Sequence, residues 1–136
     1  MKEKLRRFFD ILYSEFNLSL KEIELIFINF DVIECLLKKD FLSISDISGV
    51  ILKCRNITRS KLFNLEKGKI VSSNRVCRRK FFTIIIDRNI LEKFRKYCYC
   101  NRCGKILGSN VAIHDNIMYE KKFYCSKRCK RLANQN

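Results

Sequence analysis

Hydrophobic and polar residues alternate along the N-terminal part of the chain with the period of a helix. Apolar residues recur three and four positions apart over residues 4–16, which predicts an amphipathic helix. Ser19 and Glu22 form the Ser-x-x-Glu pattern of a capping box, so a second helix is expected over roughly 20–39. That helix is apolar on two faces, and such a helix is buried between two layers or against a partner chain. Residues 4–39 therefore form either a core element of their own domain or the surface of a homodimer.

Two shorter helices are predicted next. Residues 43–45 signal a helix start, and a short helix is expected over about 46–54. A turn at 55–56 then leads to Thr58, a good cap for a helix over about 59–67. The apolar residues of this last helix, expected to face the core, are Leu62, Phe63 and Leu65. Its polar side consists of Arg59, Ser60, Lys61, Asn64 and Lys67.

The pattern changes from helical to strand-like after Gly68, which is expected to end that helix. Residues 69–71 and 81–86 are rich in β-branched and aromatic residues and predict two strands. Residues 72–80 between them begin with turn-forming residues and continue with basic ones. The basic residues of this predicted turn are Arg75, Arg78, Arg79 and Lys80. Asp87 is expected to cap a further helix over about 88–97.

The net charge of +15 is concentrated in the second part of the chain. Residues 1–50 carry 7 Lys and Arg against 9 Asp and Glu. Residues 51–97 carry 14 against 3, and residues 98–136 carry 8 against 2. Charge of one sign gathered in one segment is typical of a protein that binds a polyanion. The alternatives are a solvated basic surface and a membrane surface, but the basic run does not form the one long amphipathic helix that a membrane surface favours.

Length and composition narrow the class of protein. The chain has 136 residues, of which 47% are hydrophobic, so it has room for one ordinary domain and a small appendage. Because no apolar stretch of about 18 residues is free of charge, no membrane span is expected. The N-terminus has neither the apolar segment nor the cleavage site of a secretory signal. We therefore expect a cytoplasmic, reducing location, where paired cysteines more often bind metal than form disulfides.

Four cysteines near the C-terminus have the spacing of a metal site. Cys100 and Cys103 form a C-x2-C pair, and Cys125 and Cys129 form a C-x3-C pair. Two such pairs can close a tetrahedral four-thiolate site around zinc. Copper(I) is the alternative ion, because soft thiolates select it too. Ser126 is placed to cap the helix that would carry Cys129.

Other candidate ligands fit this site less well. Cys98 could replace Cys100, but C-x4-C makes a poorer metal-binding knuckle than C-x2-C. His114 is expected to lie in a surface loop of the hairpin rather than to bind metal. The scattered cysteines, expected to be small apolar residues of the core, are Cys35, Cys54 and Cys77.

The order of helix, turn, helix, strand, basic turn and strand in residues 5–97 resembles the winged helix-turn-helix of MarR-like regulators. Residues 65–71 are similar to the end of that group's recognition helix and its first wing strand, and residues 78–84 to its wing and returning strand. The resemblance implies a homodimer through residues 4–39. It also implies a helix in the major groove of double-stranded DNA and a wing on phosphates or in the minor groove. The predicted DNA contacts are Arg59, Ser60, Lys61, Asn64, Lys67, Arg75, Arg78, Arg79 and Lys80.

Residues 99–129 resemble the TRASH and FCS/MYM-type zinc fingers. The resemblance rests on residues 99–106 and 123–129, which contain the four cysteines. These fingers are treble-clef-like: a knuckle, a hairpin and a helix that bears the last ligand. TRASH modules accompany winged helices in metal-responsive archaeal regulators, and FCS/MYM fingers occur in chromatin proteins and viral late transcription factors. The heavy use of Ile, Asn, Lys and Phe also fits an archaeal or viral source.

The sequence thus predicts a mainly helical α+β fold with a small β-wing. Residues 1–97 are expected to form a winged helix-turn-helix, and residues 98–136 a four-cysteine zinc finger. The expected function is that of a sequence-specific DNA-binding transcription regulator whose finger is structural or senses metal. The alternative is a non-enzymatic adaptor, whose finger recruits a protein such as a polymerase while the basic segment binds nucleic acid non-specifically. No enzyme activity or small-molecule substrate is expected, because known catalytic motifs are lacking and four thiolates leave zinc no open position.

Overall fold

The computed structural model describes residues 10, 13–108, 117–119 and 122–135. Of the helix predicted over 4–16, Asp10 and residues 13–16 are described and are helical, and the remainder lies outside the described residues. The helices and strands that follow are α2 (Leu20–Ile28), α3 (Phe30–Lys38), β1 (Leu42–Ser43), α4 (Ile44–Ile51), α5 (Arg55–Lys67), β2 (Val71–Val76), β3 (Arg79–Ile84), α6 (Arg88–Phe94), the 3-10 helix η1 (Arg95–Tyr97), β4 (Ile117–Tyr119), β5 (Lys122–Tyr124) and α7 (Lys127–Ala133).

The single helix predicted over 20–39 is wrong, because the chain forms two helices that meet at Asn29. The start is as expected: the Ser19 hydroxyl accepts a bond from the Glu22 backbone N–H, and the Glu22 carboxylate accepts one from the Ser19 N–H. At the break, the buried Asn29 side chain donates to the Leu25 carbonyl over 2.9 Å. An asparagine side chain that bonds its own backbone in this way competes with the helical ladder.

The two apolar faces of this region are covered mainly by the chain's own core. The buried residues of α2 and α3 are Ile23, Ile26, Phe27, Phe30, Val32, Ile33, Cys35 and Leu36. Within the described part of residues 4–39, the large apolar side chains that remain exposed are Tyr13 and Leu20. The apolar character of α2 and α3 is therefore explained without a partner chain, and it no longer argues for a homodimer.

The turn between α4 and α5 differs from the predicted one. α4 begins one residue after Ser43, whose hydroxyl accepts a bond from the Asp46 N–H, and it ends at Ile51. Leu52 closes it with the left-handed φ of 58°, the conformation that glycine usually supplies at a helix end. α5 then starts at Arg55, so Thr58 lies inside the helix, where its hydroxyl donates to the Cys54 carbonyl. The predicted turn at 55–56 and the predicted cap at Thr58 are therefore wrong.

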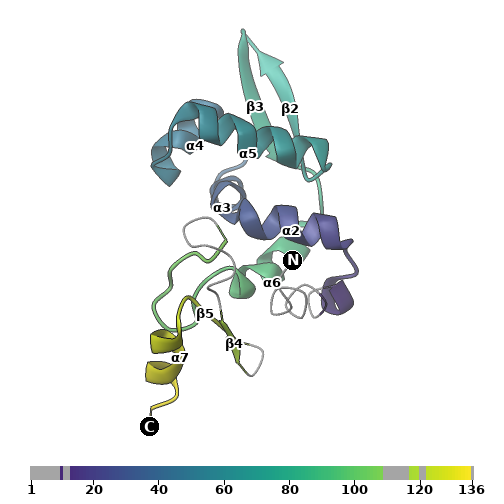
Figure 1. Ribbon diagram of the computed structural model, residues 1–136. Helices are drawn as coiled ribbons and strands as arrows, with labels where there is room; N and C mark the ends of the chain where they lie inside the picture. The colour runs from purple at the N-terminus through teal and green to yellow at the C-terminus, as the bar shows by residue number, and fades with distance from the viewer. Residues whose placement is uncertain (1–9, 11–12, 109–116, 120–121, 136) are drawn as a thin grey trace.

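A three-stranded antiparallel sheet with the order β1-β3-β2 packs beside these helices. The strand predicted over 69–71 was too short, because β2 continues to Val76, and the strand predicted over 81–86 was placed two residues late, because β3 runs from Arg79 to Ile84. Cys77 and Arg78 form the two-residue turn with φ values of 49° and 69°, as the right-handed twist of a hairpin requires. Figure 1 shows this hairpin projecting beyond α5 at one end of the molecule. Helix α4, turn, helix α5 and the β2–β3 wing form a winged helix-turn-helix.

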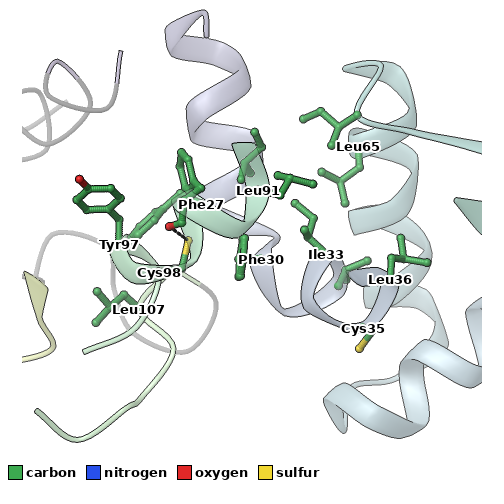
Figure 2. Packing of buried hydrophobic residues seen from close by; sticks show 14 of the residues in the cluster. Phe27, Phe30, Ile33, Cys35, Leu36, Leu65, Leu91, Tyr97, Cys98 and Leu107 are labelled. Atoms are coloured by element: carbon green, nitrogen blue, oxygen red, sulfur yellow. Dashed lines mark hydrogen bonds between the residues drawn. The ribbon is translucent and has the colours of Figure 1, made fainter. Parts of the chain in front are cut away.

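The core is continuous from the winged helix into the C-terminal segment. Buried residues from α2, α3, α5 and α6 belong to one cluster with Cys98, Leu107 and Phe123. Figure 2 shows Leu107 and Cys98 beside Tyr97, close to Phe27 and Phe30 of the helical part. The C-terminal segment carries the β4–β5 hairpin, α7 and a cluster of four cysteines. Among the described residues, no helix combines the length and the apolar character needed to cross a membrane.

Candidate nucleic-acid interface and metal centre

The outward face of α5 carries most of the polar residues predicted for it. Thr58, Leu62 and Leu65 turn toward the core and are fully buried. The predicted contact residues that are exposed on this helix are Arg59, Ser60, Asn64 and Lys67. Because α5 begins at Arg55, its first turn adds Arg55 and Asn56 to the exposed set, which the predicted helix start had missed. Asn56 accepts a bond from the Arg59 guanidinium over 3.2 Å.

Lys61 does not belong to this outward face. Its Nζ lies 3.3 Å from Asp31 Oδ1 and donates to the Ile28 carbonyl over 3.2 Å. Lys53, from the turn before α5, lies 3.2 Å from the other Asp31 oxygen. Burial lowers the pKa of Lys61, and the Asp31 carboxylate opposes that shift. The structure therefore places Lys61 as a support that fixes α5 on α3, and not with the other predicted DNA contacts.

Phe63 is the second departure on α5. It was expected in the core, but its side chain is 62% exposed on the outward face. The core-facing side is complete without it, since Leu62 and Leu65 lie on either side of it in sequence and point inward. The late start of the predicted helix does not explain the error, because residues 59–67 are helical as expected. The error was to count every apolar residue of that helix as buried.

The wing presents basic side chains along its outer half. Arg75, Arg78, Arg79 and Lys80 are exposed, and the register pairs Arg75 with Lys80 across the two strands. Lys80 also lies 3.6 Å from Glu66 of α5 and 5.5 Å from the centre of the Phe82 ring. Ser73 of β2 donates to the same Glu66 carboxylate. These contacts join the base of the wing to α5, so that the helix and the basic hairpin are held as one surface.

The four C-terminal cysteines come together as their spacing predicted. The sulfur atoms of Cys100, Cys103, Cys125 and Cys129 all lie within 4.8 Å of one another. The Cys103–Cys125 and Cys125–Cys129 sulfurs are 3.6 Å and 3.5 Å apart. A tetrahedron with Zn–S bonds of about 2.3 Å has sulfur–sulfur edges of roughly 3.8 Å. The spacing of the four sulfur atoms is therefore close to that of a tetrahedral zinc site.

Backbone hydrogen bonds hold the first pair in a knuckle. The Cys100 N–H donates to the Lys105 carbonyl over 2.8 Å, and the Gly104 N–H donates back to the Cys100 carbonyl over 3.0 Å. Gly104 has a φ of 77°, which its missing side chain permits at little cost. The second pair is set by a helix start: Ser126 caps α7 by accepting from the Cys129 N–H over 3.2 Å. The cap predicted at Ser126 is confirmed.

The sulfur atoms differ in how readily they lose a proton. Burial alone would raise the pKa of the Cys100 thiol, but hydrogen bonds from the backbone of Cys103, Cys125 and Arg102 lower it to about 6. Burial raises the pKa of Cys125, and hydrogen bonds with its neighbouring thiols raise it further, to about 12. The Cys100 thiolate is thus favoured at neutral pH, whereas the Cys125 thiol would give up its proton on binding a metal.

The remaining cysteines take different positions from one another. Cys98 is completely buried and its thiol donates to the Phe94 carbonyl, so it faces the core and not the four-sulfur cluster. Cys35 is buried as predicted. The prediction of a core position is wrong for Cys54 and Cys77, which are exposed at the start of α5 and at the tip of the wing. His114 lies outside the described residues.

The segment that carries the four cysteines packs directly on the winged helix. The Tyr97 ring meets Phe123 edge-on at 5.3 Å, and Phe30 of α3 meets Tyr99 edge-on at 6.1 Å. Gly108 lies against the backbone of α2, where a Cβ would come within 2.2 Å of the Phe27 carbonyl oxygen. α7 lies at the opposite end of the molecule from the wing (Figure 1).

Two solved structures of S. aureus MepR are similar to this chain. A MepR–DNA complex has 18% sequence identity and a TM-score of 0.44, and the match covers 66% of this chain and 72% of that chain. A MepR mutant has 18% identity and a TM-score of 0.40, and the match covers 66% of this chain and 65% of that chain. No protein-family model matches the chain, and no curated protein matches its sequence. The likeness to MepR concerns the fold alone.

Proposed function

We propose that this protein is a sequence-specific transcription regulator that binds double-stranded DNA through α5 and the wing. The observation that carries the proposal is the joining of the polar outward face of α5 to the basic β2–β3 hairpin through Glu66, Ser73 and Lys80. A helix of this size fits the major groove, where arginine and asparagine side chains bond base edges. The proposed base contacts are Arg59, Ser60 and Asn64, with Lys67 on phosphate.

The wing supplies the contacts that do not depend on sequence. Arg78 and Arg79 lie at and beside its two-residue tip, where their side chains are exposed, and Arg75 and Lys80 follow one pair further down. Guanidinium groups in such a position neutralise phosphates or enter the minor groove. In this proposal, the wing sets the affinity for any duplex, and α5 selects the sequence.

We further propose that Cys100, Cys103, Cys125 and Cys129 bind one zinc ion and that residues 98–136 form a finger of the TRASH or FCS/MYM type. The order of knuckle, hairpin and helix in the described residues supports this type. The role we assign to the metal is structural, since four thiolates leave it no open position and the cluster borders the shared core. α7 carries Lys127, Arg128, Lys130 and Arg131. These cations offset the two net negative charges of a zinc ion bound by four thiolates.

The proposed DNA surface can be tested with two matched double variants. Arg78→Ala with Arg79→Ala removes two charges from the wing, and Lys127→Ala with Arg128→Ala removes two from α7. Affinity for duplex DNA is then measured by fluorescence anisotropy at several salt concentrations. We expect the wing variant to bind every sequence more weakly and to lower the slope of log K against log salt by about 1.8, since each phosphate contact contributes about 0.9.

The α7 variant should change affinity and slope little. If instead the α7 variant loses binding and the wing variant keeps it, the finger is the DNA-binding element and our proposal is wrong.

Asn64→Ala and Arg59→Ala address sequence selection. Each is expected to lower the preference for a selected duplex over a random one by about 1–3 kcal/mol while random-sequence binding changes less. A protein that shows no preference among duplexes would instead support the adaptor alternative. A homodimer through residues 4–39 stays a prediction, which sedimentation can check.

A further inference from the structure

Phe63 occupies a position that packing does not explain. Its ring is 62% exposed in the middle of α5, although the chain has a continuous core that could have received it. The inward side of α5 is already filled by Leu62 and Leu65, both fully buried. Because α5 advances 100° per residue, Phe63 projects from nearly the opposite side to Leu65. The ring therefore points away from the molecule on the outward face of the helix.

Basic and polar side chains flank the exposed ring, and the acidic neighbour Glu66, three residues further on, is already paired with Lys80. Arg59 lies four residues before Phe63 and Lys67 four residues after it, so the three follow one line along the helix, one turn apart. Ser60 and Asn64 flank this line and are exposed as well. An apolar protein surface laid on Phe63 would strip water from both cations without pairing them, at a high cost in free energy.

The major groove of DNA offers both an apolar contact for the Phe63 ring and charged or polar partners for the residues around it. In the major groove of DNA, phosphates line the rims and pair with lysine and arginine, while the floor offers hydrogen-bonding edges. The floor also offers one apolar group, the 5-methyl of thymine, which phenylalanine can contact directly. The charge pattern around Phe63 is complementary to this groove.

We propose that Phe63 is a specificity-determining residue that contacts the 5-methyl group of a thymine in the major groove. The inference rests on the proposed function, because it needs α5 to enter that groove. It adds a base preference, thymine at the site beneath the middle of α5, to the hydrogen-bonding residues already assigned.

The test uses the natural difference between thymine and uracil, which lacks only that methyl group. Binding sites are selected with the zinc-loaded chain of 136 residues from a pool of random duplexes, and each thymine of a selected site is then replaced singly by deoxyuridine. We expect one replacement to weaken binding about four-fold, the value for one buried methyl-sized group. Phe63→Ala should weaken binding to the thymine site and should bind the thymine and uracil duplexes equally. Phe63→Leu, which keeps an apolar contact, should retain part of the discrimination.

Leu20→Ala is the matched control, since it removes an exposed apolar side chain from α2, outside the helix-turn-helix and the wing. It should leave the thymine-to-uracil ratio unchanged. If Phe63→Ala folds as the wild type by circular dichroism and still discriminates thymine from uracil as the wild type does, the proposed contact is wrong while the proposed function stands. The contact is also wrong if no uracil replacement affects the wild type. Failure of the wild type to select any sequence would overturn both.

Discussion

The contact between α2 and the segment that carries the four cysteines can be tested at Gly108. A Cβ added there would lie 2.2 Å from the Phe27 carbonyl oxygen, 2.8 Å from the Phe27 carbonyl carbon and 3.1 Å from the Ile28 Cα. All three are backbone atoms, which cannot move aside as the end of a flexible side chain can. To reach an ordinary contact of 3.4 Å, the segment that carries Gly108 must retreat by about 1.2 Å.

Such overpacking typically costs about 1–3 kcal/mol. We therefore expect Gly108→Ala to lower the free energy of unfolding by that amount, measured by urea denaturation of the zinc-loaded protein. Gly49→Ala is the matched control: nothing lies within 4 Å of its Cβ position and it lies within α4, so alanine should raise the free energy of unfolding by roughly 0.5–1 kcal/mol. A Gly108→Ala protein as stable as the wild type would refute the close packing of this segment on α2.

Three further predictions concern the ion pairs and the proposed zinc site. Asp31→Ala should lower the free energy of unfolding by about 3 kcal/mol, because it leaves the largely buried Lys61 charge uncompensated. Lys96→Ala, which breaks an exposed ion pair, should lower it by less than about 1 kcal/mol. Equal losses for the two variants in urea denaturation would contradict this prediction. Removing zinc with a chelator should unfold residues 98–135 and lower the melting temperature of the winged helix, because the two parts share one core. Identical melting curves with and without chelator would contradict this prediction. Cys100→Ser should abolish stoichiometric zinc binding by metal analysis while Cys98→Ala keeps one ion per chain, and the reverse result would make Cys98 the ligand.

The starts of α2, α6 and α7 were predictable from the sequence, because they depend on contacts between near neighbours. Ser19, Asp87 and Ser126 each accept the backbone hydrogen bond expected of a helix cap. The strand character of the wing was also visible in its β-branched and aromatic residues. The four-cysteine centre was predicted because ligand spacing limits how a chain can surround an ion.

The features that were missed depend on unusual backbone conformations or on contacts between residues far apart in the chain, neither of which the residue types indicate. Leu52, Cys77 and Arg78 adopt positive φ values, which are rare for such residues, and these values set the turn before α5 and the tip of the wing. Asn29 interrupts a region with an unbroken apolar pattern. The inward direction of Lys61 depends on Asp31, thirty positions earlier in the chain, and no local pattern indicates that pairing.

The central claim, that DNA lies on α5 and the wing, is tested most directly by amide hydrogen exchange of the zinc-loaded protein with and without a selected duplex. We predict that added DNA slows exchange within Arg55–Lys67 and at the β2–β3 turn, while exchange in α7 (Lys127–Ala133) stays unchanged. Slower exchange confined to α7 and the cysteine knuckle, with α5 and the wing unaffected, would contradict the claim.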